Sequence, residues 1–344
     1  MFKLGDFKLK TPIVQGGMAV GVSLDNLSSA VSNEGGIGVI GTAGMGLLYT
    51  NGKNNTNDSC IKGLTHYIKK AKEKTNGILG VNIMVALSNY AEMVKVAVEE
   101  KVDVIFSGAG LPLNLPSFLK KDSKTKIVPI VSSLKAAQVI FKKWFRDFNY
   151  IPDGFVVEGP DAGGHLGFKE ENITNFDFEG EVKKIINFKK EIYDNYKKYV
   201  SIIVGGGIYN KETTQKYLSL DADAVQIGTS FIATDECDAS KDFKNVIINT
   251  KQEDIKIIKS PVGMPGRAVN NNFIKRVYQG EKKPQACFYQ CIKTCEYKNT
   301  LYCIAKALYD SVIGDIENGL VFCGKNAYKI KEIISVHNLI KQLV

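Results

Sequence analysis

Short apolar runs, three to five residues long, recur along the first two thirds of the chain, with helix-like stretches between them. Each run is rich in valine and isoleucine and is largely apolar at consecutive positions, so both of its faces are suited to burial. Runs of this length are too short for helices and are typical of parallel strands covered on both sides. Eight strands are predicted in this way, at 12–15, 37–40, 79–83, 102–106, 127–131, 155–157, 202–204 and 224–227.

The stretches between these runs carry the apolar spacing of amphipathic helices. The first of them follows Ser23, which we interpret as its N-cap. Strands that alternate with helices over about 230 residues predict an α/β fold of the TIM-barrel type, (β/α)8, with a doubly wound open sheet as the second choice. The predicted helices cover 24–32, 60–74, 89–100, 135–145, 181–196 and 211–218.

The remaining sequence, 238–344, has a mainly helical pattern and no strand rhythm of the same kind. No linker rich in proline or serine separates it from the preceding part. We therefore expect a barrel over 1–237 and a helical insertion or extension over 238–344 that packs on it.

Composition narrows the class of protein. The chain is 44% hydrophobic and 24% charged, as in ordinary globular proteins. Its net charge is +9, and its basic residues are mostly scattered lysines. Such scattering indicates a solvated surface more than a nucleic-acid site. The longest uncharged run, 35–52, is broken by glycines and is a poor membrane helix, and the first residues lack an apolar signal region. We expect a cytoplasmic protein without membrane or nucleic-acid partners, and the sequence leaves homo-oligomer formation open.

A histidine stands in a glycine-rich loop directly after the predicted strand 155–157. The loop includes Gly163, Gly164 and His165, and the other two histidines, His66 and His337, have no such setting. Glycines allow the backbone to approach a ligand closely, and histidine gains or loses a proton near neutral pH. In a barrel, function lies in the loops after the strands, so His165 is the predicted catalytic residue. The alternative is a structural histidine that holds the loop by hydrogen bonds.

The loops after the last two predicted strands form a candidate phosphate site. Gly205, Gly206 and Gly207 follow one strand, and Gly228 and Thr229 follow the next. A phosphate site between the seventh and eighth strands recurs in barrels of this kind, and glycines there expose backbone N–H groups. The alternative is that these glycines only make tight turns.

Two amides, Asn82 and Gln226, lie within otherwise apolar strands. A buried amide requires hydrogen-bond partners. Either the neighbouring backbone supplies them, or the amides contact a polar cofactor ring.

Five motifs occur in an order that resembles the nitronate monooxygenase family, formerly called 2-nitropropane dioxygenases, and its relatives, the flavin-dependent enoyl-acyl-carrier-protein reductases. The motifs are Gln15-Gly16-Gly17-Met18, Glu34-Gly35-Gly36-Ile37-Gly38, Ala162-Gly163-Gly164-His165, Gly205-Gly206-Gly207-Ile208 and Gln226-Ile227-Gly228-Thr229.

The resemblance implies a barrel that binds FMN across the strand ends. It implies that the phosphate lies on Gly206, Gly207, Gly228 and Thr229, that Gln15, Gly16, Gly17, Met18 and Asn82 face the isoalloxazine or ribityl part, and that His165 stands over the reactive edge of the flavin.

The implied reaction is oxidation of an alkyl nitronate by O2 to a carbonyl compound and nitrite. In it, His165 hydrogen-bonds the nitronate oxygens or acts as base toward a neutral nitroalkane. Two alternatives share the scaffold: an NAD(P)H-dependent enoyl reductase and an NAD(P)H:quinone reductase. The first loop, 18–23, lacks the tryptophan that we associate with the enoyl reductases, which favours the monooxygenase.

Seven cysteines in a chain of this class are expected to be thiols. Cys287, Cys291, Cys295 and Cys303 form a cluster in the sequence, and the first three share one face if the segment is helical. Three ligands on one helix converge poorly on a metal, so packing is preferred to a metal or redox role. The Gly/Pro-rich loop from Ser260 to Arg267 either shapes the substrate pocket, with Arg267 as partner for an anionic substrate, or is a rigid connector between barrel and extension; the sequence does not give the direction of Arg267.

Overall fold

Eight parallel strands close into a barrel in the computed structural model, which describes residues 2–344. The order around the barrel is β3, β4, β5, β6, β7, β8, β10 and β11, so each strand pairs with its sequence neighbour and β11 closes onto β3. All eight predicted strands are confirmed. They are β3 (Ile13–Gln15), β4 (Ile37–Gly41), β5 (Ile78–Met84), β6 (Val104–Gly108), β7 (Lys126–Val131), β8 (Gly154–Glu158), β10 (Ser201–Gly205) and β11 (Ala224–Ile227).

The barrel interior is filled by branched and aromatic side chains. Val39, Phe106, Val128, Val156 and Ile203 belong to one buried cluster inside the ring of strands. A two-stranded antiparallel hairpin, β1 (Phe2–Leu4) with β2 (Phe7–Leu9), adds its own apolar side chains to that cluster. With one end closed in this way, the opposite end of the strands is left for the site.

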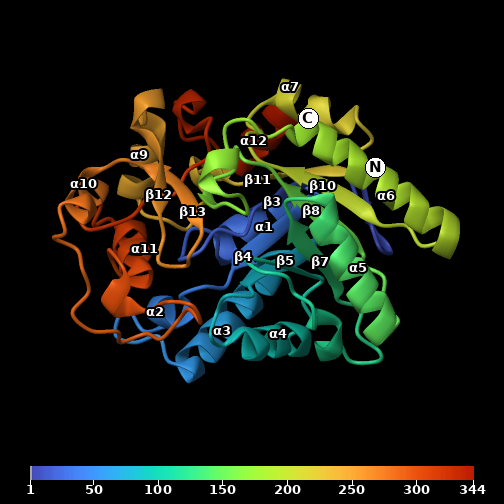
Figure 1. The fold of residues 1–344 in the computed structure, drawn as a ribbon, viewed down its shortest axis with the longest axis horizontal. Coiled ribbons are helices and arrows are strands. Elements are labelled where there is room, and N and C mark those ends of the chain that lie inside the picture. The colour runs from blue at the N-terminus through green and yellow to red at the C-terminus, as the bar shows by residue number, and fades with distance from the viewer. Residues whose placement is uncertain (1) are drawn as a thin grey trace.

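Helices surround the barrel and connect its strands (Figure 1). The predicted helical stretches are found within a few residues of their expected bounds. The helices up to the last barrel strand are α1 (Asp25–Asn33), α2 (Met45–Tyr49), α3 (Asn57–Lys74), α4 (Tyr90–Glu99), α5 (Leu134–Phe148), α6 (Phe178–Tyr196) and α7 (Lys211–Leu218).

The N-terminus of α1 is capped by a residue distant in sequence, so the prediction that Ser23 caps this helix is wrong. The Asp238 carboxylate accepts hydrogen bonds from the backbone N–H groups of Leu24 and Leu27, at 2.7 and 3.2 Å. The Ser23 hydroxyl instead accepts a hydrogen bond from the backbone N–H of Met18 at 2.8 Å, which shapes the first strand-end loop. A carboxylate satisfies helix N–H groups more strongly than a hydroxyl does.

The C-terminal part contains the expected helices and, in addition, two strands that the sequence pattern did not indicate. Strands β12 (Ile255–Lys259) and β13 (Pro265–Val269) form a hairpin, and β13 pairs with the short strand β9 (Gly164–His165). Figure 1 shows this hairpin beside the barrel, near α9, α10 and α11. The helices of this part are α9 (Lys241–Asn249), α10 (Asn272–Tyr278), α11 (Ile304–Ile313) and α12 (Val336–Leu343), and the short helix α8 (Thr229–Ile232) precedes it, after β11.

The pairing of β13 with β9 matters because β9 lies in the loop that carries the predicted catalytic histidine. The C-terminal segment therefore reaches the functional end of the barrel. The division of the chain at 237/238 stays a prediction. Among residues 2–344, no helix combines the length and the apolar character that crossing a bilayer requires.

Candidate active site

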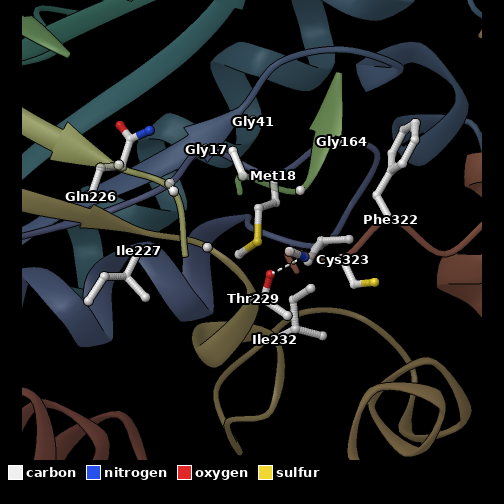
Figure 2. A pocket seen from close by; sticks show the side chains of 18 of the residues that line it. Gly17, Met18, Gly41, Gly164, Gln226, Ile227, Thr229, Ile232, Phe322 and Cys323 are labelled. Carbon is white, nitrogen blue, oxygen red and sulfur yellow. Dashed lines mark hydrogen bonds between the residues drawn. The ribbon is translucent and has the colours of Figure 1, made fainter. Parts of the chain in front are cut away.

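A cavity lies at the carboxyl ends of the barrel strands. Thirteen of the fourteen predicted site residues line it, and they come from strands and strand-end loops up to 213 residues apart in sequence, from Gly16 to Thr229. The thirteen are Gly16, Gly17, Met18, Asn82, Gly163, Gly164, His165, Gly205, Gly206, Gly207, Gln226, Gly228 and Thr229. Figure 2 shows Met18, Gly164, Gln226 and Thr229 around this space.

Gln15 is the predicted site residue that does not line the cavity. Its side chain is fully buried, and its Oε1 accepts a hydrogen bond from the backbone N–H of Val39 at 2.9 Å. The amide therefore ties β3 to β4 and is occupied by the protein backbone, as a buried amide must be.

The loops after β10 and β11 form the part of the cavity that we call the glycine cradle: Gly206, Gly207, Gly228 and Thr229. Gly206 and Gly207 have φ angles of 109° and 74°, a conformation that favours glycine. The backbone N–H groups of all four residues lack a protein acceptor in residues 2–344. Unpaired N–H groups beside a cavity fit a phosphate group.

A segment near the C-terminus completes the cradle, and the sequence pattern did not single it out. The Thr229 hydroxyl accepts a hydrogen bond from the backbone N–H of Gly324 at 2.8 Å, drawn as a dashed line in Figure 2. The Asn326 side chain donates to the Gly207 carbonyl oxygen at 2.7 Å. Both residues line the cavity, and their sequence neighbours carry no motif that would have identified them.

The first strand-end loop approaches the barrel closely. A Cβ atom at Gly17 would overlap the Asn82 side chain and stand 2.9 Å from Val39, so only glycine fits there. The side-chain amides of Asn82 and Gln226 face the cavity and make no hydrogen bond with the protein in residues 2–344. Amides left without protein partners beside a cavity favour the cofactor interpretation over the structural one.

The His165 ring is held from the C-terminal segment. Its Nε2 lies 2.7 Å from the Ser260 hydroxyl oxygen, and the Phe322 ring packs edge-on with centroids 5.1 Å apart. Ser260 lies directly after β12, and β13 pairs through Gly266 with His165 itself. Burial lowers the pKa of His165 to about 4, so the imidazole is neutral at neutral pH.

Arg267 has a different position from the one expected for a substrate ligand. It is buried and does not line the cavity. Its guanidinium donates to the carbonyl oxygens of Pro160 and Ala162, both at 2.6 Å. Arg267 thus fixes the loop that precedes His165, and the expectation that it faces an anionic substrate is wrong.

Glu158, at the end of β8, is an ionisable residue of the cavity that the sequence prediction missed. Its carboxyl group has no hydrogen-bond or ion-pair partner in residues 2–344, and burial raises its pKa to about 7. The signal in the sequence is its place, because the last residue of a barrel strand is where functional side chains lie. We call Glu158 and His165 together the ionisable end of the cavity.

The cysteine cluster does not lie on a helix. The segment 281–303 contains only one short helical turn, Tyr297–Asn299, so the condition for a shared helical face is not met. Burial, and then the nearby Cys303 thiol, raise the pKa of Cys291 to about 12. Within residues 2–344, no group of three or more His, Cys, Asp or Glu side chains is arranged to hold a metal ion.

The sequence model of the family described as "Nitronate monooxygenase" matches residues 2–344. The chain belongs to the nitronate monooxygenase family. Two curated relatives, each a "probable nitronate monooxygenase" of Staphylococcus aureus, are similar to it. The one from strain Newman is 27% identical over 301 residues, and the one from strain MSSA476 is 25% identical over 308 residues. In both cases 79% of each chain is covered.

Solved structures with the same architecture include FabK from Thermotoga maritima, with a TM-score of 0.72, 26% identity and coverage of 97% of this chain and 92% of that one. Nitroalkane oxidase from Streptomyces ansochromogenes has a TM-score of 0.70, 19% identity and coverage of 97% and 94%, and it supports the fold alone. With the family match, the chain is an enzyme, a flavin-dependent oxidoreductase built on a TIM barrel.

Proposed function

We propose that the protein is an FMN-dependent nitronate monooxygenase that oxidises alkyl nitronates with O2 to carbonyl compounds and nitrite. The observation that carries the proposal is the joint arrangement of the glycine cradle and His165 around one cavity in a chain of this family. The cradle offers four unpaired N–H groups for the phosphate of the cofactor, and Asn82 and Gln226 offer free amides for its polar ring.

FMN, when bound, would supply the electron transfer to oxygen, and the protein would bind and orient the substrate. Gly16, Gly17 and Met18 would line the face along which the cofactor lies, and Gly17 lets the loop approach Asn82 and Val39 more closely than any side chain would allow. Gly163 lets the backbone of Cys323 and Gly324 approach, since a Cβ atom there would stand 2.6 Å from the Cys323 carbonyl carbon, and Gly164 would leave the cavity beside His165 free of a side chain.

The role of His165 follows from its protonation. A group that holds a proton only below about pH 4 is a weak base at neutral pH. It would remove a proton from a neutral nitroalkane poorly, and it suits a substrate that arrives already deprotonated. We therefore assign to His165 the hydrogen bonding and orientation of the nitronate, with Ser260 holding the ring in place at Nε2.

The alternative is an NAD(P)H-dependent reductase on the same scaffold, acting on an enoyl thioester or a quinone. The similarity to the FabK structure, at 26% identity with 97% of this chain covered, supports this alternative. It uses the same cradle and differs in its need for a reduced nicotinamide. The cytoplasmic location remains a prediction from the sequence, which leaves homo-oligomer formation open.

Oxygen consumption by the purified yellow protein, given propane-2-nitronate and no reduced nicotinamide, tests the proposal. We expect rapid oxygen uptake with release of nitrite. Absence of uptake, together with bleaching of the flavin by NADH or NADPH, would contradict the proposal and support the reductase.

A further inference from the structure

Glu158 is an unpaired carboxyl group enclosed in the cavity that also holds His165. It follows four buried residues of β8, and no donor in residues 2–344 hydrogen-bonds it. Glu158 is half-buried, and a carboxylate withdrawn from water without a partner is costly, so such a group normally keeps its proton or acquires a partner. Here the partner is absent from the described residues, and Glu158 lines the cavity.

The cavity contains no cationic side chain. None of the residues that line it is a lysine or an arginine, and its two carboxylates are those of Glu158 and Asp161. Asp161 has a counter-ion, the Lys325 ammonium group at 3.1 Å, whereas Glu158 has none. An anionic ligand in this cavity would therefore meet an uncompensated negative charge whenever Glu158 is ionised.

The other titratable groups facing the cavity are His165, Tyr209 and Cys323. Burial holds the pKa of His165 down to about 4 and raises that of Cys323 to about 12, so both stay neutral between pH 6 and pH 9. Burial places the pKa of Glu158 at about 7, within that window. Glu158 is thus the group positioned to change the charge of the cavity near neutral pH.

We propose that the protonated form of Glu158 is the form that accepts an anionic ligand beside His165, so that anion binding above neutral pH is coupled to uptake of one proton. The proposal rests on the proposed function, because it identifies the anion as the substrate class. A protonated carboxyl adds no charge and offers one O–H donor to a nitronate oxygen. An ionised carboxyl repels the same ligand.

The expected dependence on pH follows from this coupling. Below about pH 7 Glu158 holds its proton, and affinity for the anion is constant. Above that pH the proton must be taken up on binding, and the dissociation constant rises about tenfold per pH unit. A neutral ligand of the same shape binds without this dependence.

The test uses the FMN-loaded protein and two unreactive probes, isobutyrate as the anion and isobutyramide as its neutral counterpart. Binding is followed between pH 6 and pH 9 through the flavin absorbance. For the unaltered protein we expect the tenfold rise per pH unit with isobutyrate and a flat profile with isobutyramide. In Glu158→Gln the isobutyrate profile should become flat. In Asp161→Asn, the matched change at the paired carboxylate, the rise should remain.

Three outcomes would overturn the proposal: a flat isobutyrate profile in the unaltered protein, the same rise in Glu158→Gln, or no isobutyrate binding at pH 6.

A second measurement needs no variant. Calorimetric titration with isobutyrate in two buffers of different ionisation enthalpy should report uptake of about one proton per bound anion at pH 8 and almost none at pH 6. Uptake near zero at pH 8 would equally reject it. Neither assay needs turnover. Oxygen uptake without proton coupling would therefore reject the proposed role of Glu158 and still support the monooxygenase function.

Discussion

The glycine cradle presents backbone N–H groups to a ligand. The ionisable end of the same cavity presents the side chains of His165 and Glu158. Backbone groups keep their polarity at every pH, and their positions follow from the strand ends. The two side chains have pKa values displaced in opposite directions, to about 4 and about 7, both by burial. The contribution of the cradle N–H groups should therefore not change with pH, while binding and turnover of substrate beside Glu158 and His165 should depend on it.

The largest expected effect is at the ionisable end. His165→Ala should retain FMN and lower kcat/KM with propane-2-nitronate by about 10²–10³-fold, because the variant lacks the hydrogen-bonding group that orients the nitronate. Oxygen uptake measures this. His337→Ala is the matched control, since His337 is exposed and pairs with Glu34 on the surface. Full turnover in His165→Ala would leave that residue with a structural role only.

A smaller effect is expected at the cradle. A Cβ atom at Gly228 would stand 3.5 Å from the Met18 sulfur, an ordinary contact, so Gly228→Ala should fold normally. The added methyl group enters the space assigned to the cofactor and should weaken FMN binding by roughly 10–100-fold, about 1.4–3 kcal/mol. Fluorescence titration with FMN, together with thermal unfolding, separates binding from folding. Unchanged FMN affinity would place the cofactor elsewhere.

Glu158 should affect the stability of the FMN-free protein in a direction fixed by its pKa. The folded state holds the Glu158 proton up to about pH 7, while the unfolded chain releases it at a lower pH. Stability is therefore lost as pH rises through this window and stays low above it.

Glu158→Gln should match the unaltered protein near pH 4.5 and exceed it at pH 8 by up to about 3 kcal/mol. Denaturant unfolding at both pH values measures the difference. Equal stabilities at pH 8 would show that the carboxyl is hydrated and that its pKa is not raised.

The smallest effect concerns the hold on the His165 ring. Ser260→Ala removes the hydroxyl 2.7 Å from Nε2 and should lower kcat about fivefold, which corresponds to about 1 kcal/mol for one hydrogen bond. FMN affinity should not change, and Ser260→Thr should recover most of the loss. If Ser260→Ala lowers FMN affinity instead, the hairpin of β12 and β13 acts on the cradle and not on the ring.

The strands and their glycine loops were predictable because a parallel strand buried on both faces must be apolar along its whole length. The runs at 37–40 and 202–204, for example, are completely buried in the structure, within β4 and β10. The histidine loop and the cradle follow from the same rule, since the ends of such strands meet on one face of a barrel. Local pattern and site geometry are therefore linked for this part of the chain.

Gln15 and Ser23 show where local pattern was insufficient. Both stand near the strand-end loop and have side chains that suit the roles predicted for them, yet the backbone of Val39 and Met18 engages them. The actual cap of α1 is Asp238, more than 200 residues away. Hydrogen-bond partners of polar side chains depend on which segments meet in space, and composition does not encode this directly.

The sequence by itself determined the barrel, the order of its loops and the cavity residues that are glycines or lie directly beside them, because strand burial and backbone conformation restrict residue type locally. Tertiary structure alone decided how the C-terminal segment completes the site: Ser260 against His165, Gly324 and Asn326 against the cradle, and Arg267 under the loop. It also decided that Glu158 is left without a partner, since a carboxyl acquires a displaced pKa only from what surrounds it.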